Sequence, residues 1–127
     1  MKRNPFCHDC FMHIRRANAI FTACAHSTCN SEHFEQIGYQ YSVLASEARS
    51  SRMQVLASYA QAMASFARKL VSRSTANLDE KEKKLLQNGI DAGLPCQEGE
   101  NFDQCPNQNF DRVWPLITEL RENSQSG

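Results

Sequence analysis

Four of the six cysteines and all four histidines of the chain lie near its N-terminus, within residues 7–33. Cys7 and Cys10 are spaced C-x2-C, and Cys24 and Cys29 are spaced C-x4-C. Two thiolates at such short spacings can bind the same metal ion without strain, and the thirteen residues between the pairs are enough to bring them together. The spacing therefore predicts a tetrahedral structural zinc site with these four cysteines as ligands.

Histidine side chains extend this set of candidate ligands. His13 follows the first cysteine pair by three residues, His26 lies inside the second pair, and His33 follows the second pair by four residues. A neutral imidazole is a common zinc ligand, so any of the three can replace a thiolate. Two features count against zinc: neither pair contains the glycine that helps a chain turn around a thiolate, and the residues between the pairs favour helix.

Disulfide bonds are the alternative use of the cysteines. Bridges between the first pair and the second pair would join two antiparallel segments as two rungs, and a bridge from Cys96 to Cys105 would close a polar loop. That third bridge would contribute about 2.7 kcal/mol by the loop-entropy relation. Disulfides are rare in the cytosol, and charged residues and histidines interrupt any secretory signal in residues 1–16. Zinc in a cytoplasmic protein and disulfides in a periplasmic or secreted protein, with a signal removed, both stay open.

No catalytic motif stands out elsewhere in the chain. The sequence contains no phosphate-binding loop, no dinucleotide-binding fingerprint and no H-E-x-x-H motif. The C-x-x-C at residues 7–10 lacks the strand and helix pattern that surrounds redox dithiols, and Phe11 stands where covalent haem attachment needs histidine. We therefore expect a small regulatory or adaptor protein that acts by binding and is not an enzyme.

The net charge of zero conceals a division between the two parts of the chain. Residues 1–76 carry nine Lys and Arg against four Asp and Glu, whereas residues 77–127 carry five against ten. Arg15 and Arg16 lie in the Cys/His-rich segment, and a zinc site that held them rigid would present them to phosphates at little entropic cost. Contact with nucleic acid is therefore a secondary prediction, although DNA-binding domains are usually basic overall.

Hydrophobic residues recur at every third or fourth position over most of the chain, which is the period of an amphipathic helix. The first such segment covers residues 9–25, although residues 19–22 also fit a short strand. Asn30 or Ser31 is placed to cap the next segment, residues 32–74, which contains no proline. The apolar positions of the two segments are Phe11, Ile14, Ala17, Phe21, Cys24, Ile37, Tyr41, Leu44, Ala48, Val55, Leu56, Tyr59, Ala62, Met63, Phe66, Ala67, Leu70 and Val71.

The second of these segments is too long for a compact fold. A straight helix over residues 32–74 would be about 65 Å long, whereas a domain of this size has a radius of gyration of about 14 Å. Either the helix breaks near the polar residues 46–52 and folds back as a hairpin, or it stays whole and pairs with a second copy. Its apolar stripes between Leu44 and Val71 offer more surface than two short helices can cover, so we expect a homodimer.

Two shorter helices are predicted in the C-terminal part. The first starts at Asn77, carries acidic residues in its first turns and ends at Gly93, and its D-E-K-E-K-K run is expected to face solvent. The second begins after Asn107 or Asn109 and is kinked or delayed by Pro115. Their inner positions are predicted to be Leu78, Leu85, Leu86, Ile90, Phe110, Val113, Trp114, Ile117 and Leu120.

These elements predict an all-α fold, a small helical bundle with one long central helix and an N-terminal Cys/His-rich knot. No stretch approaches the roughly 20 apolar residues of a membrane-spanning helix. We expect a cytoplasmic protein with a protein partner. The expected single domain, residues 1–127, divides into residues 1–33 (the Cys/His-rich segment), 34–76 (the long helix or hairpin) and 77–122 (two short helices joined by the loop with Cys96 and Cys105).

Overall fold

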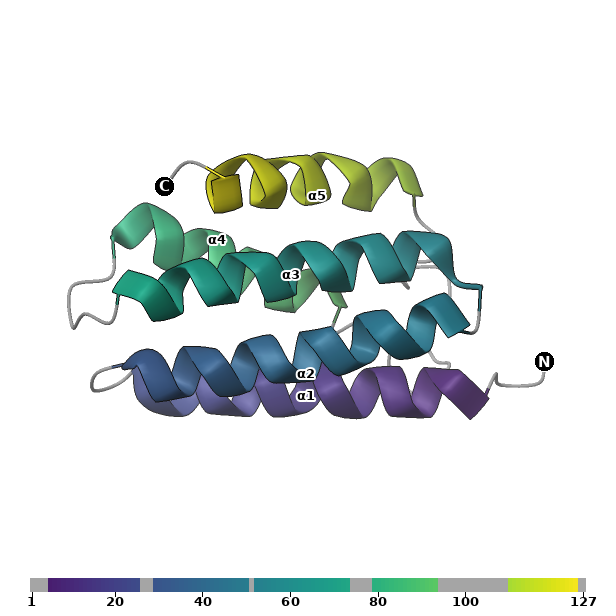
Figure 1. Cartoon of the computed structure of the whole chain (residues 1–127), viewed down its shortest axis with the longest axis horizontal. Coiled ribbons are helices and arrows are strands. Elements are labelled where there is room, and N and C mark those ends of the chain that lie inside the picture. Colours follow the sequence, from purple (N-terminus) through teal and green to yellow (C-terminus); the bar gives the residue numbers. More distant parts are fainter. Residues whose placement is uncertain (1–4, 26–28, 51, 74–78, 94–109, 126–127) are drawn as a thin grey trace.

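A computed structural model describes five helices that pack around one hydrophobic core (Figure 1). The described residues contain no strand, so the fold is an all-α helical bundle, as predicted. None of the described helices combines the length and the apolar character needed to span a bilayer. The backbone is described for residues 5–25, 29–50, 52–73, 79–93 and 110–125, and side chains for 12–25, 29–50, 52–71, 79–93 and 113–124.

The first helix, α1 (Pro5–Ala25), is continuous, so the short strand considered for residues 19–22 is not formed. It begins four residues earlier than predicted because proline is tolerated in the first turn, where its missing N–H has no helical partner. Every predicted inner position of α1 whose side chain is described is buried: Ile14, Ala17, Phe21 and Cys24.

The long apolar segment breaks and folds back as a hairpin of two helices, α2 (Ser31–Ser50) and α3 (Gln54–Arg73). The break falls where polar residues 46–52 predicted it. In Figure 1, α2 lies between α1 and α3 and runs antiparallel to both, and α3 forms the centre of the bundle. The hairpin brings the apolar stripe of α2 against that of α3, which is how both stripes are buried within one chain.

The homodimer was predicted because the apolar stripes were expected to be too large to be covered within one chain. The structure covers them within one chain. Tyr41, Leu44, Tyr59 and Phe66 are fully buried by the chain's own helices. Among the described residues, only Tyr39 and Trp114 are large hydrophobic side chains with substantial exposure, at 65% and 39%. The uncovered apolar surface that motivated the homodimer is therefore not found in the described residues, and the homodimer stays an untested prediction.

The fourth helix, α4 (Glu80–Gly93), starts later than predicted. Asp79 caps it, because its Oδ1 accepts the Lys81 N–H at 3.1 Å and its carbonyl accepts the Lys83 N–H at 2.9 Å. Asn77, the predicted first residue, and Leu78, a predicted inner residue, lie outside the described residues. The other predicted inner positions of α4, Leu85, Leu86 and Ile90, are buried.

The charged run of α4 was predicted to face solvent, but one of its residues is buried. Glu82 is only 5% exposed and lies 3.7 Å from the Lys69 ammonium of α3. Lys69 also donates a hydrogen bond to the carbonyl oxygen of Asn123, near the end of the last helix. The pair thus joins three helices, and the compensation of one buried charge by the other is what permits Glu82 to be buried.

The last helix, α5 (Phe110–Gln125), runs along α3 and contains Pro115 within its first two turns. Val113, Ile117 and Leu120 are buried as predicted. Trp114 is not: its ring is partly exposed and the Arg121 guanidinium lies over it, 5.4 Å from the ring centroid. By the three-to-four-residue period, Trp114 lies at the edge of the apolar face of α5. Whether a side chain at this edge is buried or exposed depends on the neighbouring helices.

Two glycines allow α4 to approach its neighbours closely. A Cβ atom on Gly89 would lie 2.3 Å from the Met63 sulfur, and one on Gly93 would lie 2.7 Å from Ile14 Cδ1 and 2.8 Å from the Tyr59 hydroxyl. The close approach lets the buried Tyr59 hydroxyl donate to the carbonyl oxygen of Gly89 at 2.5 Å. Tyr41 packs edge-on against Tyr59 at 5.9 Å between ring centroids, so the two rings form a buried aromatic pair.

We predict that Gly93→Ala destabilises the protein by about 2 kcal/mol, because an added methyl group overpacks the contact with Ile14 and Tyr59. Gly38→Ala is the matched control. A Cβ on Gly38 of α2 would meet nothing closer than 3.5 Å, so this variant should be neutral or up to about 1 kcal/mol more stable through helix propensity. Urea unfolding measures both variants, and equal stability changes for the two would contradict the close approach of α4.

Candidate functional site

The two cysteine pairs of the predicted zinc site lie at opposite ends of α1. Cys7 and Cys10 fall in the first two turns, whereas Cys24 is in the last turn. Thirteen residues of continuous helix lie between Cys10 and Cys24, so fourteen steps of 1.5 Å place the two cysteines about 21 Å apart along the helix. Zinc–sulfur bonds are only about 2.3 Å long. One ion cannot contact both pairs unless α1 breaks, so the structure does not bring the four predicted ligands together.

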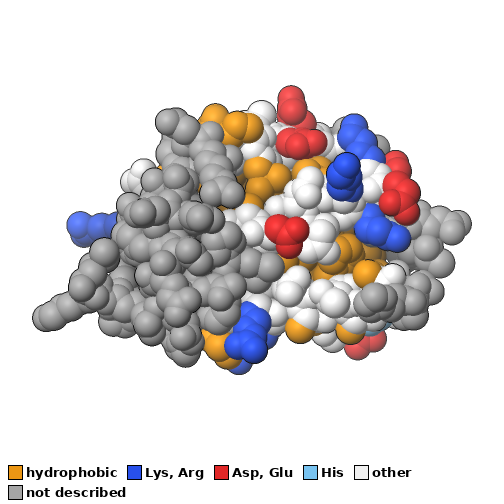
Figure 2. All heavy atoms as spheres, turned by 180° about the vertical axis from the view of Figure 1, so that it is seen from behind, with side chains coloured by type: hydrophobic (Ala, Val, Ile, Leu, Met, Phe, Trp, Pro, Cys, Tyr) orange, Lys and Arg blue, Asp and Glu red, His pale blue; other side chains and the backbone are white. Residues whose placement is uncertain are grey.

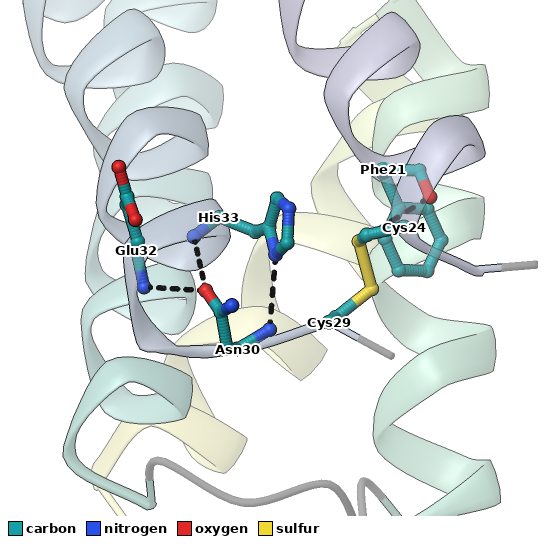
Figure 3. The surroundings of a disulfide bond; sticks show 6 residues. All are labelled: Phe21, Cys24, Cys29, Asn30, Glu32 and His33. Carbon is teal, nitrogen blue, oxygen red and sulfur yellow. Dashed lines mark hydrogen bonds between the residues drawn. A yellow bond between two sulfur atoms is a disulfide. The ribbon is translucent and has the colours of Figure 1, made fainter. Parts of the chain in front are cut away.

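The second pair forms a disulfide bond between Cys24 and Cys29 (Figure 3). This pairing differs from the two rungs predicted for disulfides, in which cysteines of the first pair joined those of the second. Cys24 is buried beside Phe21, and Cys29 lies in the connection just before α2. The bond therefore links the end of α1 to the beginning of α2.

The residues that follow the disulfide form a reciprocal N-cap of α2 (Figure 3). Asn30 Oδ1 accepts the N–H groups of Glu32 and His33 at 3.0 and 3.2 Å, and His33 Nδ1 accepts the N–H of Asn30 at 3.0 Å. This is a capping box in which histidine takes the place usually held by glutamate or glutamine. Of the two residues predicted as the cap, Asn30 and Ser31, Asn30 is the one that caps α2, and His33 Nδ1 is engaged in the same cap.

His13, another of the histidines predicted to replace a thiolate, connects α1 to α2. Its Nδ1 lies 2.9 Å from Gln40 Oε1 and its Nε2 lies 3.0 Å from Glu47 Oε1. Both ring nitrogens thus face polar groups of α2, and the side chain is largely buried at 14% exposure. In this position His13 holds two helices together.

Other members of the predicted set lie outside what the structure describes. These are His26, Cys96 and Cys105, together with the side chains of Cys7 and Cys10. Among the described residues, no three His, Cys, Asp or Glu side chains are grouped so as to hold a metal ion. Arg15 and Arg16, the predicted phosphate contacts, are both exposed on α1.

A groove with several polar side chains lies on another part of the molecule. It has a volume of about 770 Å³ and is formed at the end of α2, along the first half of α3 and on α5. Its volume is within the range of small-ligand sites, about 300–1,000 Å³. We call it the arginine groove, and it is lined by Arg49, Arg52, Gln54, Ala57, Ser58, Gln61 and Arg121.

Three arginines from three segments converge on this groove, and none of the described residues that line it is acidic. Figure 2 shows the molecule from behind relative to Figure 1. There, in the part not covered by grey atoms, positive and negative side chains lie intermixed around hydrophobic ones. The arginine groove is thus a local concentration of positive charge on a neutral protein.

Arg52 is placed by the helix end that terminates α2. Its N–H donates to the carbonyl of Arg49 at 3.1 Å, and the N–H of Met53 donates to the carbonyl of Ala48 at 2.9 Å. These two bonds define a Schellman motif, in which the residue at the turn adopts the left-handed conformation. Arg52 has φ 62°, a conformation that glycine adopts at little cost but that strains an L-residue with a side chain.

The other two arginines are held by neighbouring side chains. Arg49 Nη1 donates to Gln61 Oε1 at 3.3 Å, which connects the end of α2 to α3 across the groove. Arg121 stacks over the ring of Trp114 on α5. Both contacts orient a guanidinium and use only part of its hydrogen-bonding capacity, since arginine carries five N–H donors.

Sequence reasoning did not find this groove. Arg49 and Arg52 belong to the polar stretch that was interpreted only as a helix break, and Arg121 lies about seventy residues further along the chain. The excess of positive charge in residues 1–76 was the one available signal, and it did not indicate which arginines meet.

Comparisons with known proteins supply no further guide to function. No protein family, no curated protein and no solved structure matches the chain. The function is therefore argued from the disulfide and the arginine groove alone.

Proposed function

We propose that this protein is a disulfide-stapled helical protein that acts by binding a protein partner in an oxidising compartment, in the periplasm or outside the cell. The observation that carries the proposal is the Cys24–Cys29 disulfide, which joins two helices at the edge of the hydrophobic core. Structural disulfides persist in oxidising compartments and are rare in reducing cytosol.

The position of the disulfide supports a structural role. Cys24 is 3% exposed, so one half of the bond is packed in the core and shielded from reductants in solution. Its partner immediately precedes Asn30, the residue that caps α2. The bond therefore restricts the turn between α1 and α2 at the point where the second helix begins, and a cross-link of this kind stabilises the fold chiefly by constraining the unfolded chain.

A binding role fits the composition of the arginine groove. The groove offers guanidinium, amide and hydroxyl groups, and the described lining residues include no cysteine, histidine or carboxylate that would serve as nucleophile or general base. Groups of this kind recognise and orient an anionic partner. These groups support a binding role, and the prediction that the protein is not an enzyme stays untested.

The zinc site in a cytoplasmic protein remains a separate prediction. With Cys7, Cys10, Cys24 and Cys29 as ligands it requires reduced thiols and a break in α1, since one ion cannot reach both ends of that helix. The two proposals differ in the oxidation state of Cys24 and Cys29. A measurement of free thiols on one protein sample therefore distinguishes them.

We predict that Cys24 and Cys29 resist alkylation in protein isolated from its own source with free thiols blocked at lysis. Each disulfide protects two cysteines, so intact mass before and after reduction counts the bridges and peptide mapping locates them. The zinc prediction expects instead all four cysteines to react after chelation, with about one zinc per chain by elemental analysis. Alkylation of Cys24 and Cys29 without prior reduction would overturn the proposed function.

A second prediction concerns stability. Cys24→Ala/Cys29→Ala should lower the free energy of unfolding by about 2 kcal/mol, the loop-entropy value for so short a closed loop. Urea unfolding of the wild type with and without a reductant is the matched comparison. The reductant should lower wild-type stability by about 2 kcal/mol more than it lowers that of the double variant, which retains the other four cysteines. An equal effect on both proteins would argue against the bond.

Contact with nucleic acid through Arg15 and Arg16 remains a secondary prediction, supported by the exposure of both residues on α1. A phosphate role predicts that Arg15→Ala/Arg16→Ala weakens binding to duplex or single-stranded DNA and makes its salt dependence shallower. Fluorescence anisotropy at low salt measures both quantities. Absence of binding by the wild type at low salt, where attraction to phosphates is strongest, would show that the two arginines are ordinary solvent-exposed helix positions.

A further inference from the structure

We propose that the arginine groove is the docking site for an acidic segment of the protein partner, whose carboxylates bind the guanidinium groups of Arg49, Arg52 and Arg121. This inference rests on the proposed function, because it names the part of the protein that meets the partner and the chemistry of what it meets. The disulfide and the groove are separate features, so each can fail by itself in experiment.

The charge of the groove selects an anionic ligand. Its three arginines come from the end of α2, the turn that follows and α5, and the described lining residues contribute no carboxylate to neutralise them. Arginine matches the planar geometry of a carboxylate, which accepts two parallel N–H bonds from one guanidinium. Gln54, Ser58 and Gln61 add neutral hydrogen-bonding groups along the same wall, suited to the amides of a peptide backbone.

The conformation of Arg52 is the second observation that favours a binding role. A helix end of this type places its turn residue at positive φ, and glycine is the residue that does so without strain. Arg52 holds φ 62° with a long charged side chain at the rim of the groove. Strained residues concentrate at sites where the side chain contributes to function. An arginine at this strained position is accounted for if its guanidinium contributes to binding.

Trp114 adds an apolar contact beside the charges. Its ring is 39% exposed and lies under the guanidinium of Arg121, which itself lines the groove. Tryptophan and arginine are enriched among the residues that contribute most to protein–protein binding. An acidic segment that also carries hydrophobic side chains would place its carboxylates on the arginines and an apolar side chain against the Trp114 ring.

The extent of the basic surface favours an acidic peptide over nucleic acid. A nucleic-acid site needs a basic stripe that follows many phosphates, and the domains that carry one are usually basic overall. Here the net charge is zero and the three arginines occupy one groove of about 770 Å³. That space accommodates a few residues of a peptide and does not provide a long electrostatic track.

The test measures binding of a fluorescein-labelled peptide of glutamate and leucine to the oxidised full chain by fluorescence anisotropy at low salt. A single-stranded oligothymidine of the same charge and inorganic tripolyphosphate are the competing probes. The expected result is that the peptide binds, that added salt weakens its binding, and that neither competitor displaces it at an equal concentration of charge.

The variant that decides the question is Arg52→Gly. Glycine relieves the strain at positive φ, so the melting temperature should rise by about 3–5 °C, while the Kd for the peptide should rise about threefold through loss of one exposed charge pair. A protein that is more stable and yet binds less tightly cannot owe its weaker binding to unfolding. Arg49→Gln/Arg121→Gln removes the other two guanidinium groups and should raise the Kd about tenfold.

Lys84→Ala is the matched control, since it removes one positive charge from an exposed position on α4, outside the groove. Its Kd for the peptide should equal that of the wild type. The proposal is overturned if Lys84→Ala weakens binding as much as Arg52→Gly, because the attraction is then nonspecific. It is also overturned if the peptide does not bind the oxidised chain, or if oligothymidine or tripolyphosphate binds the groove more tightly than the peptide does. None of these binding results bears on the disulfide. If Cys24 and Cys29 are found bonded, the proposed oxidising compartment stands even when the groove proposal fails.

Discussion

The arrangement of the helices depends on the reversal of the chain between α2 and α3. Two amphipathic helices without an intervening proline are turned against each other by a Schellman motif whose turn residue, Arg52, adopts the left-handed conformation. The reversal folds one apolar stripe onto the other and makes α3 the centre of the bundle, with α2 on one side and α5 on another. It also brings Arg49 and Arg52 to the rim of the groove that Arg121 completes. The architecture and the candidate binding site therefore share one backbone constraint.

The remaining helices are positioned by close packing and by buried polar contacts. Gly89 and Gly93 let α4 approach α1 and α3 so closely that the Tyr59 hydroxyl reaches a main-chain carbonyl oxygen of α4. The buried pair of Lys69 and Glu82 acts at the same interface and extends to α5 through Asn123. Contacts of this kind tolerate little displacement, because a shifted helix would leave a buried charge or hydroxyl without its partner. They favour one arrangement of helices among the many that hydrophobic burial alone would permit.

The cysteines serve the fold in a different way from the one their spacing suggests. The spacing of two cysteines in the sequence predicts that their thiols can meet only if the residues between them can bend. In this protein the thirteen residues between the pairs belong to one helix, which acts as a rigid spacer and separates the pairs. Cys24 is then free to pair with Cys29, its neighbour across the turn, and the histidines at His13 and His33 are used to join and cap helices.

The helical class, most of the buried residues and several helix boundaries follow from local patterns in the sequence. The period of Ile14, Ala17 and Phe21 placed the inner face of α1, Asn30 marked the start of α2, and Gly93 marked the end of α4. The polar stretch before Arg52 indicated the break in the long segment. These features depend on local patterns, namely helical periodicity, capping groups and helix-breaking residues, which act over a few neighbouring positions.

Contacts between residues of different helices follow from the packing of the helices and were not predictable from local patterns. The pairing of Cys24 with Cys29, the burial of Glu82, the exposure of Trp114 and the grouping of Arg49 with Arg121 each depend on how helices distant in sequence pack together. Local patterns predict the face of each helix but not its neighbour, because many packings bury the same apolar stripes. The choice among them depends on a turn at positive φ, on glycines that permit close contact and on one buried ion pair, and it is this choice that creates the arginine groove.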